Sequence, residues 1–565
     1  MNYKDNTRIT KKMKNFLAQS FSISYAILRV ALILGYCRVM NVYEPSYPRD
    51  ENASVPHFLA GVGIILLLAV WSFTPSNGQN MSLPRDQTDE WKGWMQMVFI
   101  LYHYYRARFV YNWMRVFVSS YMFLTGYGNF LFFQKTKDFS LKRVANVLLR
   151  LSFFPVLLSL LVANEVGLGE GGHEERGTLR GREGGQSALL KDFRLAETTD
   201  VWTFFTPLQA TPMMQNLEDG MALYYVVPLH IYGFLQTYVV CYLVFRLLPL
   251  LKQMCSSRRS AQAEGEEPPR LLGEVQRLDQ QMACIQEDSE TEIRARDQVF
   301  ASKVTEVVPC STTKEVTEVL CGTAIVLVAT AYTFGDLSGL LEKVRGLKLG
   351  QKGGTDFNYF TADATKIGVA TTTGTSTTST ITLTPAQREK QFRLSLDRYS
   401  ALSGIVVAAL QQRFTERRMP NMKIFEAVFG SRGTCWTCFC CALVGSMLLA
   451  TWYGVWGCIA EKRDYNKLHA VGVFFPPILG YLLLRNATVK LRSGHSAILA
   501  KIGQASLEFY VLQFHVLMSR NVQHIPALLS SPLLNAVVTG GIMLVLAMHL
   551  RSATAEIVSG LLRLW

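Results

Sequence analysis

Long apolar runs alternate with short polar segments along almost the whole chain. About 20 apolar residues are needed for a helix to cross the roughly 30 Å hydrocarbon core of a bilayer, and three of the runs are short for this purpose. The pattern predicts an all-α polytopic membrane protein with about 10–12 transmembrane helices. The twelve candidate runs fall at about 21–38, 57–73, 93–105, 109–133, 144–163, 221–250, 316–335, 398–412, 434–459, 468–484, 497–518 and 533–551.

Three polar segments interrupt this pattern. Residues 166–200 are rich in glycine and charge, residues 254–300 mix Glu, Gln and Arg, and residues 350–385 are rich in threonine and glycine. We interpret them as inserts in one multispan domain. The predicted organisation is an N-terminal two-helix membrane anchor region at 1–83, followed by the multispan domain at 84–560.

The charge of the chain fits a membrane protein better than a nucleic-acid-binding one. The 565 residues carry a net charge of +14, and 49% of them are hydrophobic. The basic residues lie mostly in short loops, such as 134–143, 413–423 and 485–496, rather than on one face of a soluble domain. Basic short loops mark the cytosolic side of a membrane protein, so both termini are predicted to be cytosolic and no nucleic acid is expected. The sequon at Asn52 falls in an outer loop and is a predicted glycosylation site.

The stretch from Gln87 to Phe130 holds the most informative residues. His103 and Arg115 lie inside apolar runs, where an ionisable side chain costs about 2.5–3.5 kcal/mol on insertion scales and therefore suggests function. Lys92 and His103 are separated by about 16 Å along a helix. This spacing places Lys92 at one membrane face and His103 near the middle of the bilayer.

Several short motifs, in a fixed order, resemble one family. They are Glu90–Gln96, Tyr102-His103-Tyr104, Thr125–Phe130, Tyr224-Tyr225 with His230, Phe392-Arg393 with Leu396–Tyr399, Tyr465–Lys467 with His469, Leu484–Asn486, and Gly503 with Leu507-Glu508 and Gln513–His515. The chain resembles the Cas1-type multispan O-acetyltransferases over roughly residues 84–560. Within this family it is most similar to the plant reduced wall acetylation proteins, and it is also similar to the membrane part of sialate O-acetyltransferase.

The resemblance implies a membrane O-acetyltransferase that moves acetyl groups from cytosolic acetyl-CoA to hydroxyls of a lumenal polysaccharide or glycan, in the Golgi membrane. Its relatives with an SGNH-type lumenal domain carry a Gly-Asp-Ser motif, which residues 1–90 lack. A separate lumenal SGNH-type acetyltransferase is therefore an expected partner, beside the glycan acceptor and membrane lipid. Two alternatives remain open: an acetyl-shuttling module for that partner, or a proton-coupled solute transporter, which buried His and Arg would suit.

The predicted catalytic residues are His103, Glu508 and His515. An imidazole can act as a general base or become transiently acetylated, and His103 is expected to do one of these. Glu508 and His515 are seven residues apart, on one helix face, where a carboxylate could orient an imidazole such as that of His103. The structural alternatives are a hydrogen bond from His103 to a neighbouring helix and an ion pair at Glu508.

The remaining predicted roles concern the two substrates. Lys92, Arg115 and Arg143 are expected to bind the phosphates of acetyl-CoA, although Arg115 could also stabilise the oxyanion or pair within its own helix. A helix-end ion pair is the alternative for Asp397 and Arg398. No metal is expected, since the C-x-x-C at Cys435 has no second pair or His cluster to complete a zinc site. The predicted acceptor-binding residues are Tyr127, Asn129, His230, Asp397, Arg398 and His469.

Overall fold

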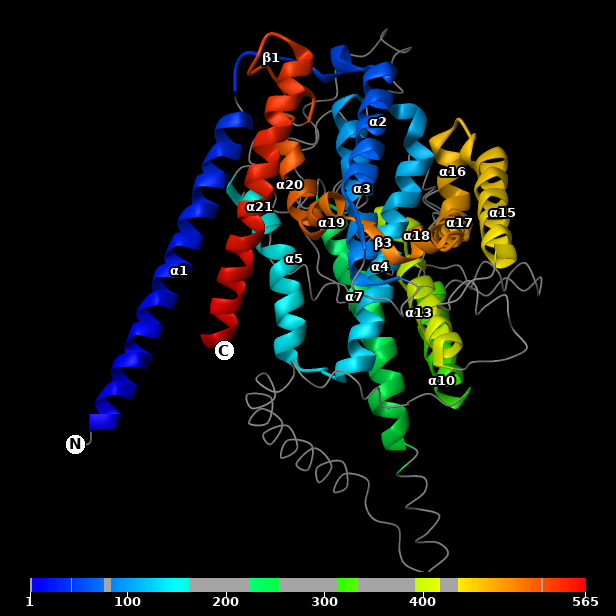
Figure 1. Ribbon diagram of the computed structural model, residues 1–565, viewed down its shortest axis with the longest axis horizontal. Helices are drawn as coiled ribbons and strands as arrows, with labels where there is room; N and C mark the ends of the chain where they lie inside the picture. The colour runs from blue at the N-terminus through cyan, green and yellow to red at the C-terminus, as the bar shows by residue number, and fades with distance from the viewer. Residues whose placement is uncertain are drawn as a thin grey trace, which may run out of the picture.

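The computed structural model describes residues 3–41, 43–75, 83–161, 224–251, 253, 313–333, 392–416, 435–519 and 522–564, and these are almost entirely helical (Figure 1). The all-α membrane class is confirmed. The three predicted inserts lie outside the described residues, so their interpretation stays a prediction, as does the division at residue 83.

Within the described residues, every apolar run found in the sequence coincides with helical structure. The helices are α1 (Tyr3–Asn41), α2 (Val55–Trp71), α3 (Arg85–Tyr104), α4 (Tyr111–Thr136), α5 (Leu141–Leu161), α7 (Val226–Tyr242), α10 (Thr313–Thr333), α13 (Ser400–Glu416), α15 (Cys435–Trp452), α16 (Lys462–Leu468), α17 (Phe475–Arg485), α18 (Val489–Ser493), α19 (Ala497–Gln504), α20 (Ser506–Val516) and α21 (Pro532–Leu564). Short 3-10 or π-helical turns are η1 (Arg49–Asn52), η2 (Arg108–Val110), η6 (Leu243–Leu247), η7 (Tyr453–Gly457) and η8 (His469–Val473).

Six helices among the described residues are long and apolar enough to cross a membrane, and a bent pair makes up to seven. The six are Ser20–Asn41, Arg108–Thr136, Leu141–Leu161, Val226–Leu251, Phe439–Gly457 and Pro532–Arg563. The bent pair is Lys462–Val473 with Phe475–Arg485, at 60° to each other. The number of spans in the whole chain stays a prediction.

Two predicted spans are broken rather than continuous. The run 468–484 bends at Gly472, whose φ of +116° is readily available only to glycine, and Pro476 and Pro477 restart the helix. The run 497–518 is divided between α19 and α20 at Ala505, which has non-helical angles of φ −107° and ψ 21°. Apolar periodicity alone does not reveal such breaks.

Helices α3 and α4 lie at the centre of the molecule, with α1 and α21 side by side on one flank and α15–α17 on the other (Figure 1). An ion pair of 2.7 Å between Arg29 and Glu556 joins α1 to α21. Two antiparallel strand pairs connect distant segments at the helix ends: β1 (Ser46–Pro48) with β4 (His524–Pro526), and β2 (Phe73–Pro75) with β3 (Gly494–Ser496).

Glycines allow the central helices to approach closely. A Cβ atom at Gly503 of α19 would lie 1.7 Å from the carbonyl oxygen of Asp89, and one at Gly93 of α3 would lie 1.8 Å from that of Leu499. Helices α4 and α13 meet in the same way, since a Cβ at Gly126 would lie 2.0 Å from the Ala401 carbonyl oxygen. Small residues of this kind are typical of helix contacts in membranes, where backbone proximity and van der Waals packing replace the hydrophobic effect.

We therefore expect Gly503→Ala to destabilise the protein by more than the about 1–3 kcal/mol typical of an overpacked core, because the new methyl group meets backbone rather than a movable side chain. Thermal unfolding of the detergent-solubilised protein measures the effect. Gly540→Ala in α21 is the matched control, since a Cβ there meets nothing within 4 Å. Equal stability of the two variants would contradict the close packing of α3 on α19.

Candidate active site

A cavity of about 710 Å³ opens between α3, α4, α5, α7, α19 and α20. Its volume lies in the range of small-molecule sites. Seven of the residues selected from the sequence line it, although they are spread over more than 400 positions of the chain: Lys92, His103, Tyr127, Asn129, Arg143, His230 and Glu508. The other six, Asn52, Arg115, Asp397, Arg398, His469 and His515, do not.

Positive charge predominates around this cavity. Its lining includes five basic side chains, Arg85, Lys92, Lys135, Arg143 and Arg150, and two acidic ones, Asp89 and Glu508. The Nζ atom of Lys92 pairs with Asp89 Oδ1 at 2.6 Å, and the Arg143 guanidinium lies 3.9 Å from the centre of the Phe132 ring. An excess of fixed cations in a concave site attracts polyanionic ligands.

His103 lies near the end of α3 and contributes an imidazole to the cavity. Its ring packs edge-on against Phe514 of α20, with centroids 5.5 Å apart, and lies 4.9 Å from the ring of Tyr102. Among the described residues it has ring contacts but no hydrogen bond or ion pair. The structural alternative for this residue, a hydrogen bond to a neighbouring helix, is thus not seen in the described part of the chain.

The second imidazole of the cavity, that of His230 on α7, is held by a hydrogen bond. Its Nδ1 lies 2.8 Å from the Thr125 hydroxyl of α4, and its ring meets Tyr121 edge-on at 6.2 Å. Asn129 donates from Nδ2 to the Thr125 carbonyl at 2.9 Å, and Tyr127 donates to Gln411 of α13 at 2.6 Å.

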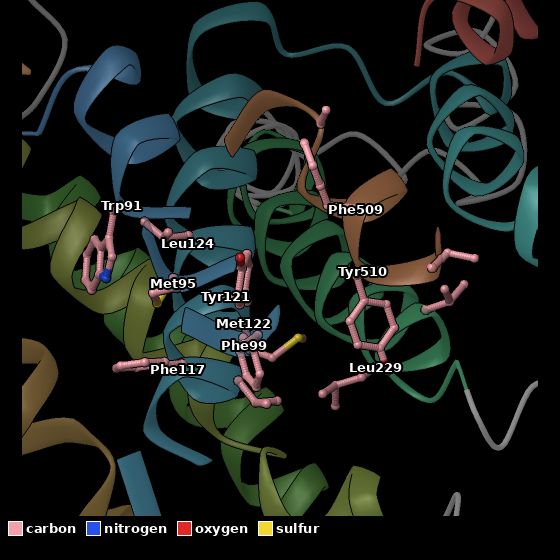
Figure 2. Packing of buried hydrophobic residues seen from close by; sticks show 14 of the residues in the cluster. Trp91, Met95, Phe99, Phe117, Tyr121, Met122, Leu124, Leu229, Phe509 and Tyr510 are labelled. Carbon is pink, nitrogen blue, oxygen red and sulfur yellow. The ribbon is translucent and has the colours of Figure 1, made fainter. Parts of the chain in front are cut away.

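Apolar and aromatic side chains form much of the remaining wall. Figure 2 shows Phe99 of α3, Tyr121 and Met122 of α4, Leu229 of α7 and Tyr510 of α20 facing a common region, and all five line the cavity. The hydroxyl of Tyr121 donates to the Lys92 carbonyl at 2.7 Å, which ties α4 to α3. A cavity with a basic part and an apolar part suits an amphipathic ligand with a charged end.

Arg115 belongs to a separate, fully buried cluster. Its Nη2 donates to Asp397 Oδ2 at 2.7 Å, so its partner is on another segment rather than within α4. The Ser119 hydroxyl donates to the other carboxylate oxygen of Asp397 and lies 2.8 Å from Nε2 of His469, within hydrogen-bond distance. The Asp397 and His469 side chains are 0% exposed and that of Arg115 is 2% exposed. The helix-end pairing considered for Asp397 is therefore an ion pair between distant segments.

The other predicted residues make local or structural contacts. His515 is buried, and its Nε2 is bonded to the Tyr224 hydroxyl, whereas Glu508 on the same helix faces the cavity. Arg398 donates to the nearby Ser395 carbonyl and lies 4.9 Å from the Tyr399 ring centroid.

Asn52, the predicted glycosylation site, is only 9% exposed. Its Nδ2, the atom that would carry an N-glycan, donates to the Tyr104 carbonyl at 3.0 Å. This packing does not favour glycosylation there.

Several contributors were not selected from the sequence. Thr125 and Ser119 are hydroxyl residues within an apolar run, and Ser119-Ser120-Tyr121 is a polar interruption of that run which could have drawn attention to it. Lys135 lies in the basic loop predicted at 134–143 and Arg150 within the apolar run 144–163, and both line the cavity. No group of three or more potential metal ligands occurs in the part of the chain that the structure describes.

The comparisons with known proteins identify the family. The chain matches the family described as the 10 TM Acyl Transferase domain found in Cas1p over residues 2–165 and 373–562, which is more than half its length. It belongs to this family of membrane acyltransferases. It is also 37% identical over 140 residues to a Danio rerio protein, N-acetylneuraminate (7)9-O-acetyltransferase, and the alignment spans 24% of this chain and 18% of that protein. No solved structure matches.

Loss of the Asp397 charge should destabilise the folded protein by about 3–5 kcal/mol, because it leaves Arg115 as an uncompensated buried cation. Asp397→Asn keeps the shape and tests the charge alone, with thermal unfolding in detergent as the measurement. The matched control is Asp464→Asn, which removes an exposed ion pair with Lys467 and should change little. Similar unfolding temperatures for both variants would argue against an ion pair in the interior.

Proposed function

We propose that this protein is an O-acetyltransferase that moves acetyl groups from cytosolic acetyl-CoA to hydroxyls of a lumenal glycan or polysaccharide, in the Golgi membrane with both termini cytosolic. The observation that carries the proposal is the single cavity that joins two imidazoles, His103 and His230, to five basic side chains. Acyl transfer from a thioester to a hydroxyl needs a proton acceptor and a site for a polyanionic donor, and this cavity offers both.

The basic side chains suit the phosphates of coenzyme A. Lys135 lies at the end of α4, while Arg143 and Arg150 lie on the first half of α5, so the three are close to the α4–α5 connection. Arginine binds phosphate through paired donors, and Lys92 could exchange Asp89 for a phosphate oxygen. The apolar wall formed by Phe99, Met122 and Leu229 would then accommodate the pantetheine arm.

The cavity also has the length that the reaction requires. Lys92 and His103 both line it, and they lie about 16 Å apart along α3. A donor whose phosphates lie among the basic residues near Lys92 would extend its thioester toward His103. There His103 acts as the general base or accepts the acetyl group on its ring, and Glu508, which lines the same cavity, supplies a carboxylate nearby.

The name of the Danio rerio relative supports a carbohydrate acceptor, because N-acetylneuraminate is a sugar. The alternative functions are delivery of acetyl groups to a separate lumenal SGNH-type transferase and proton-coupled transport of a solute. Purified protein that acetylates a glycan by itself would exclude the first, and acetyl-CoA-dependent labelling of glycan or protein would exclude the second.

The direct test places purified protein in liposomes, with radiolabelled acetyl-CoA outside and mixed glycans inside. We expect His103→Ala to lower glycan labelling by about 10²–10⁴-fold, the usual contribution of a proton-transferring group. His549→Ala, at an exposed position of α21, is the control and should remain active. Label that stays on the wild-type protein would favour the shuttle, and absence of label from both glycan and well-folded protein would overturn the acetyl-CoA assignment.

A second prediction concerns the donor. Arg143→Gln should raise the KM for acetyl-CoA about tenfold and leave kcat nearly unchanged, because a phosphate contact remote from the thioester contributes equally to ground state and transition state. Initial rates at varied acetyl-CoA measure both constants, and Arg563→Gln near the end of α21 serves as the charge-matched control. An unchanged KM would place the phosphates elsewhere.

A further inference from the structure

The two imidazoles of the cavity differ in how their rings are held. His103 touches Phe99, Tyr102 and Phe514 through its ring, and these contacts leave its tautomer undetermined. His230 is fixed by a hydrogen bond from a second helix, between its Nδ1 and Thr125 Oγ1. A general base works best when a third group orients its lone pair toward the proton that it removes.

The hydrogen bonds of Thr125 determine which nitrogen of His230 carries the proton. A threonine hydroxyl has one hydrogen, and Thr125 donates it to the Tyr121 carbonyl one turn earlier in α4, at 2.9 Å. With its hydrogen directed at that carbonyl, the same oxygen lies 2.8 Å from His230 Nδ1 and is placed to accept, which favours the neutral imidazole with its proton on Nδ1. The Nε2 atom then keeps its lone pair and is available as a proton acceptor.

The position of Thr125 is itself restrained. Its carbonyl accepts from Nδ2 of Asn129 at 2.9 Å, and its hydroxyl bond to the preceding turn is the usual one for threonine in a helix. Lys92 of α3 and Tyr121 of α4 lie near His230, and Glu508 and Tyr510 of α20 line the same cavity. None of them forms a hydrogen bond with the His230 ring in the described part of the chain.

The other two histidines of the matched motifs are used differently. His469 is bonded to Ser119 and Tyr465, and His515 to Tyr224, and neither lines the cavity. Their hydrogen bonds hold buried segments together. The bond to Thr125, in contrast, orients a ring that forms part of the cavity wall.

We propose that His230, in the tautomer set by Thr125, is the residue that takes the proton from the acceptor hydroxyl during acetyl transfer. This inference rests on the proposed function. His103 then takes the other of its two roles and carries the acetyl group: its ring nitrogen forms a bond to the carbonyl carbon, the bond from that carbon to the thioester sulfur breaks, and the proton of the ring passes to the thiolate, giving free CoA. As the acceptor O–H bond then breaks, its proton moves to His230 Nε2, and the oxygen forms a bond to the acetyl carbonyl carbon. The bond from that carbon to His103 breaks, and the proton on His230 Nε2 returns to the His103 ring, giving the acetyl ester. Thr125 is a positioning residue that acts through His230.

The experiment compares Thr125→Val with Thr125→Ser in the liposome assay, with full kcat and KM determination from pH 5 to 9. Valine has the shape of threonine without the hydroxyl, whereas serine keeps the hydrogen bond. We expect Thr125→Val to lower kcat about 10–100-fold, by analogy with the loss of the hydrogen-bond partner that orients a metal-ligating imidazole, with an unchanged KM for acetyl-CoA. Thr125→Ser should restore most of the rate.

The pH profile separates this role from a structural one. In the wild type kcat should fall at acid pH, since a protonated His230 cannot accept a proton, and His230→Gln should remove that acid limb along with most of the rate. If the wild type is active and Thr125→Val changes neither kcat nor its pH profile, this inference alone is overturned. The same holds if the acid limb of the pH profile persists in His230→Gln. A well-folded wild type without transfer from acetyl-CoA would overturn the proposed function together with it.

Discussion

A carboxylate that has no contact with water organises the centre of this protein. Asp397 precedes α13, yet its two oxygens are bonded to Arg115 and Ser119 on α4, and it lies 3.4 Å from His469 in the broken helix. An unpaired charge at this depth would cost several kcal/mol, so the three segments must stay together for the charge to be tolerated. The position of α4, and with it the cavity wall that α4 forms, depends on this pairing.

Helix α4 therefore carries two functions on neighbouring faces. Arg115 and Ser119, one turn apart, face Asp397, while Val118, Met122 and Thr125 lie on the stripe that lines the cavity. A rotation of α4 that disturbed the ion cluster would also displace Thr125 relative to His230. The buried ion pair thus fixes the position of the site residues on α4. This explains why an ionisable residue, Arg115, occurs in this apolar helix without lining the cavity.

The sequence predicts the helices well and the partners of its polar residues poorly. The apolar runs predicted the positions of the described membrane helices, because the length and hydrophobicity of a segment determine whether it can span a bilayer. Seven of the selected residues share one cavity, among them His103, an ionisable group inside an apolar run, where such a group usually has a function. The pairing of Arg115 with Asp397, 282 positions away, depends on tertiary packing, which no local pattern encodes. The same is true of Asn52, whose sequon gives no sign that its amide is buried against Tyr104.

The polar character of α3 has its reason in the same packing. Asp89, Glu90 and Lys92 would be costly on a helix facing lipid, but α3 is enclosed by α2, α4, α19 and α20, and Glu90 pairs with Arg485 at 2.5 Å. Gly93 and Gly503 bring α3 and α19 into backbone contact, so the cavity beside them has rigid walls. A rigid cavity holds His103 and His230 at fixed positions, and preorganisation of this kind lowers the barrier to transfer because the imidazoles need not move into place when the substrates arrive.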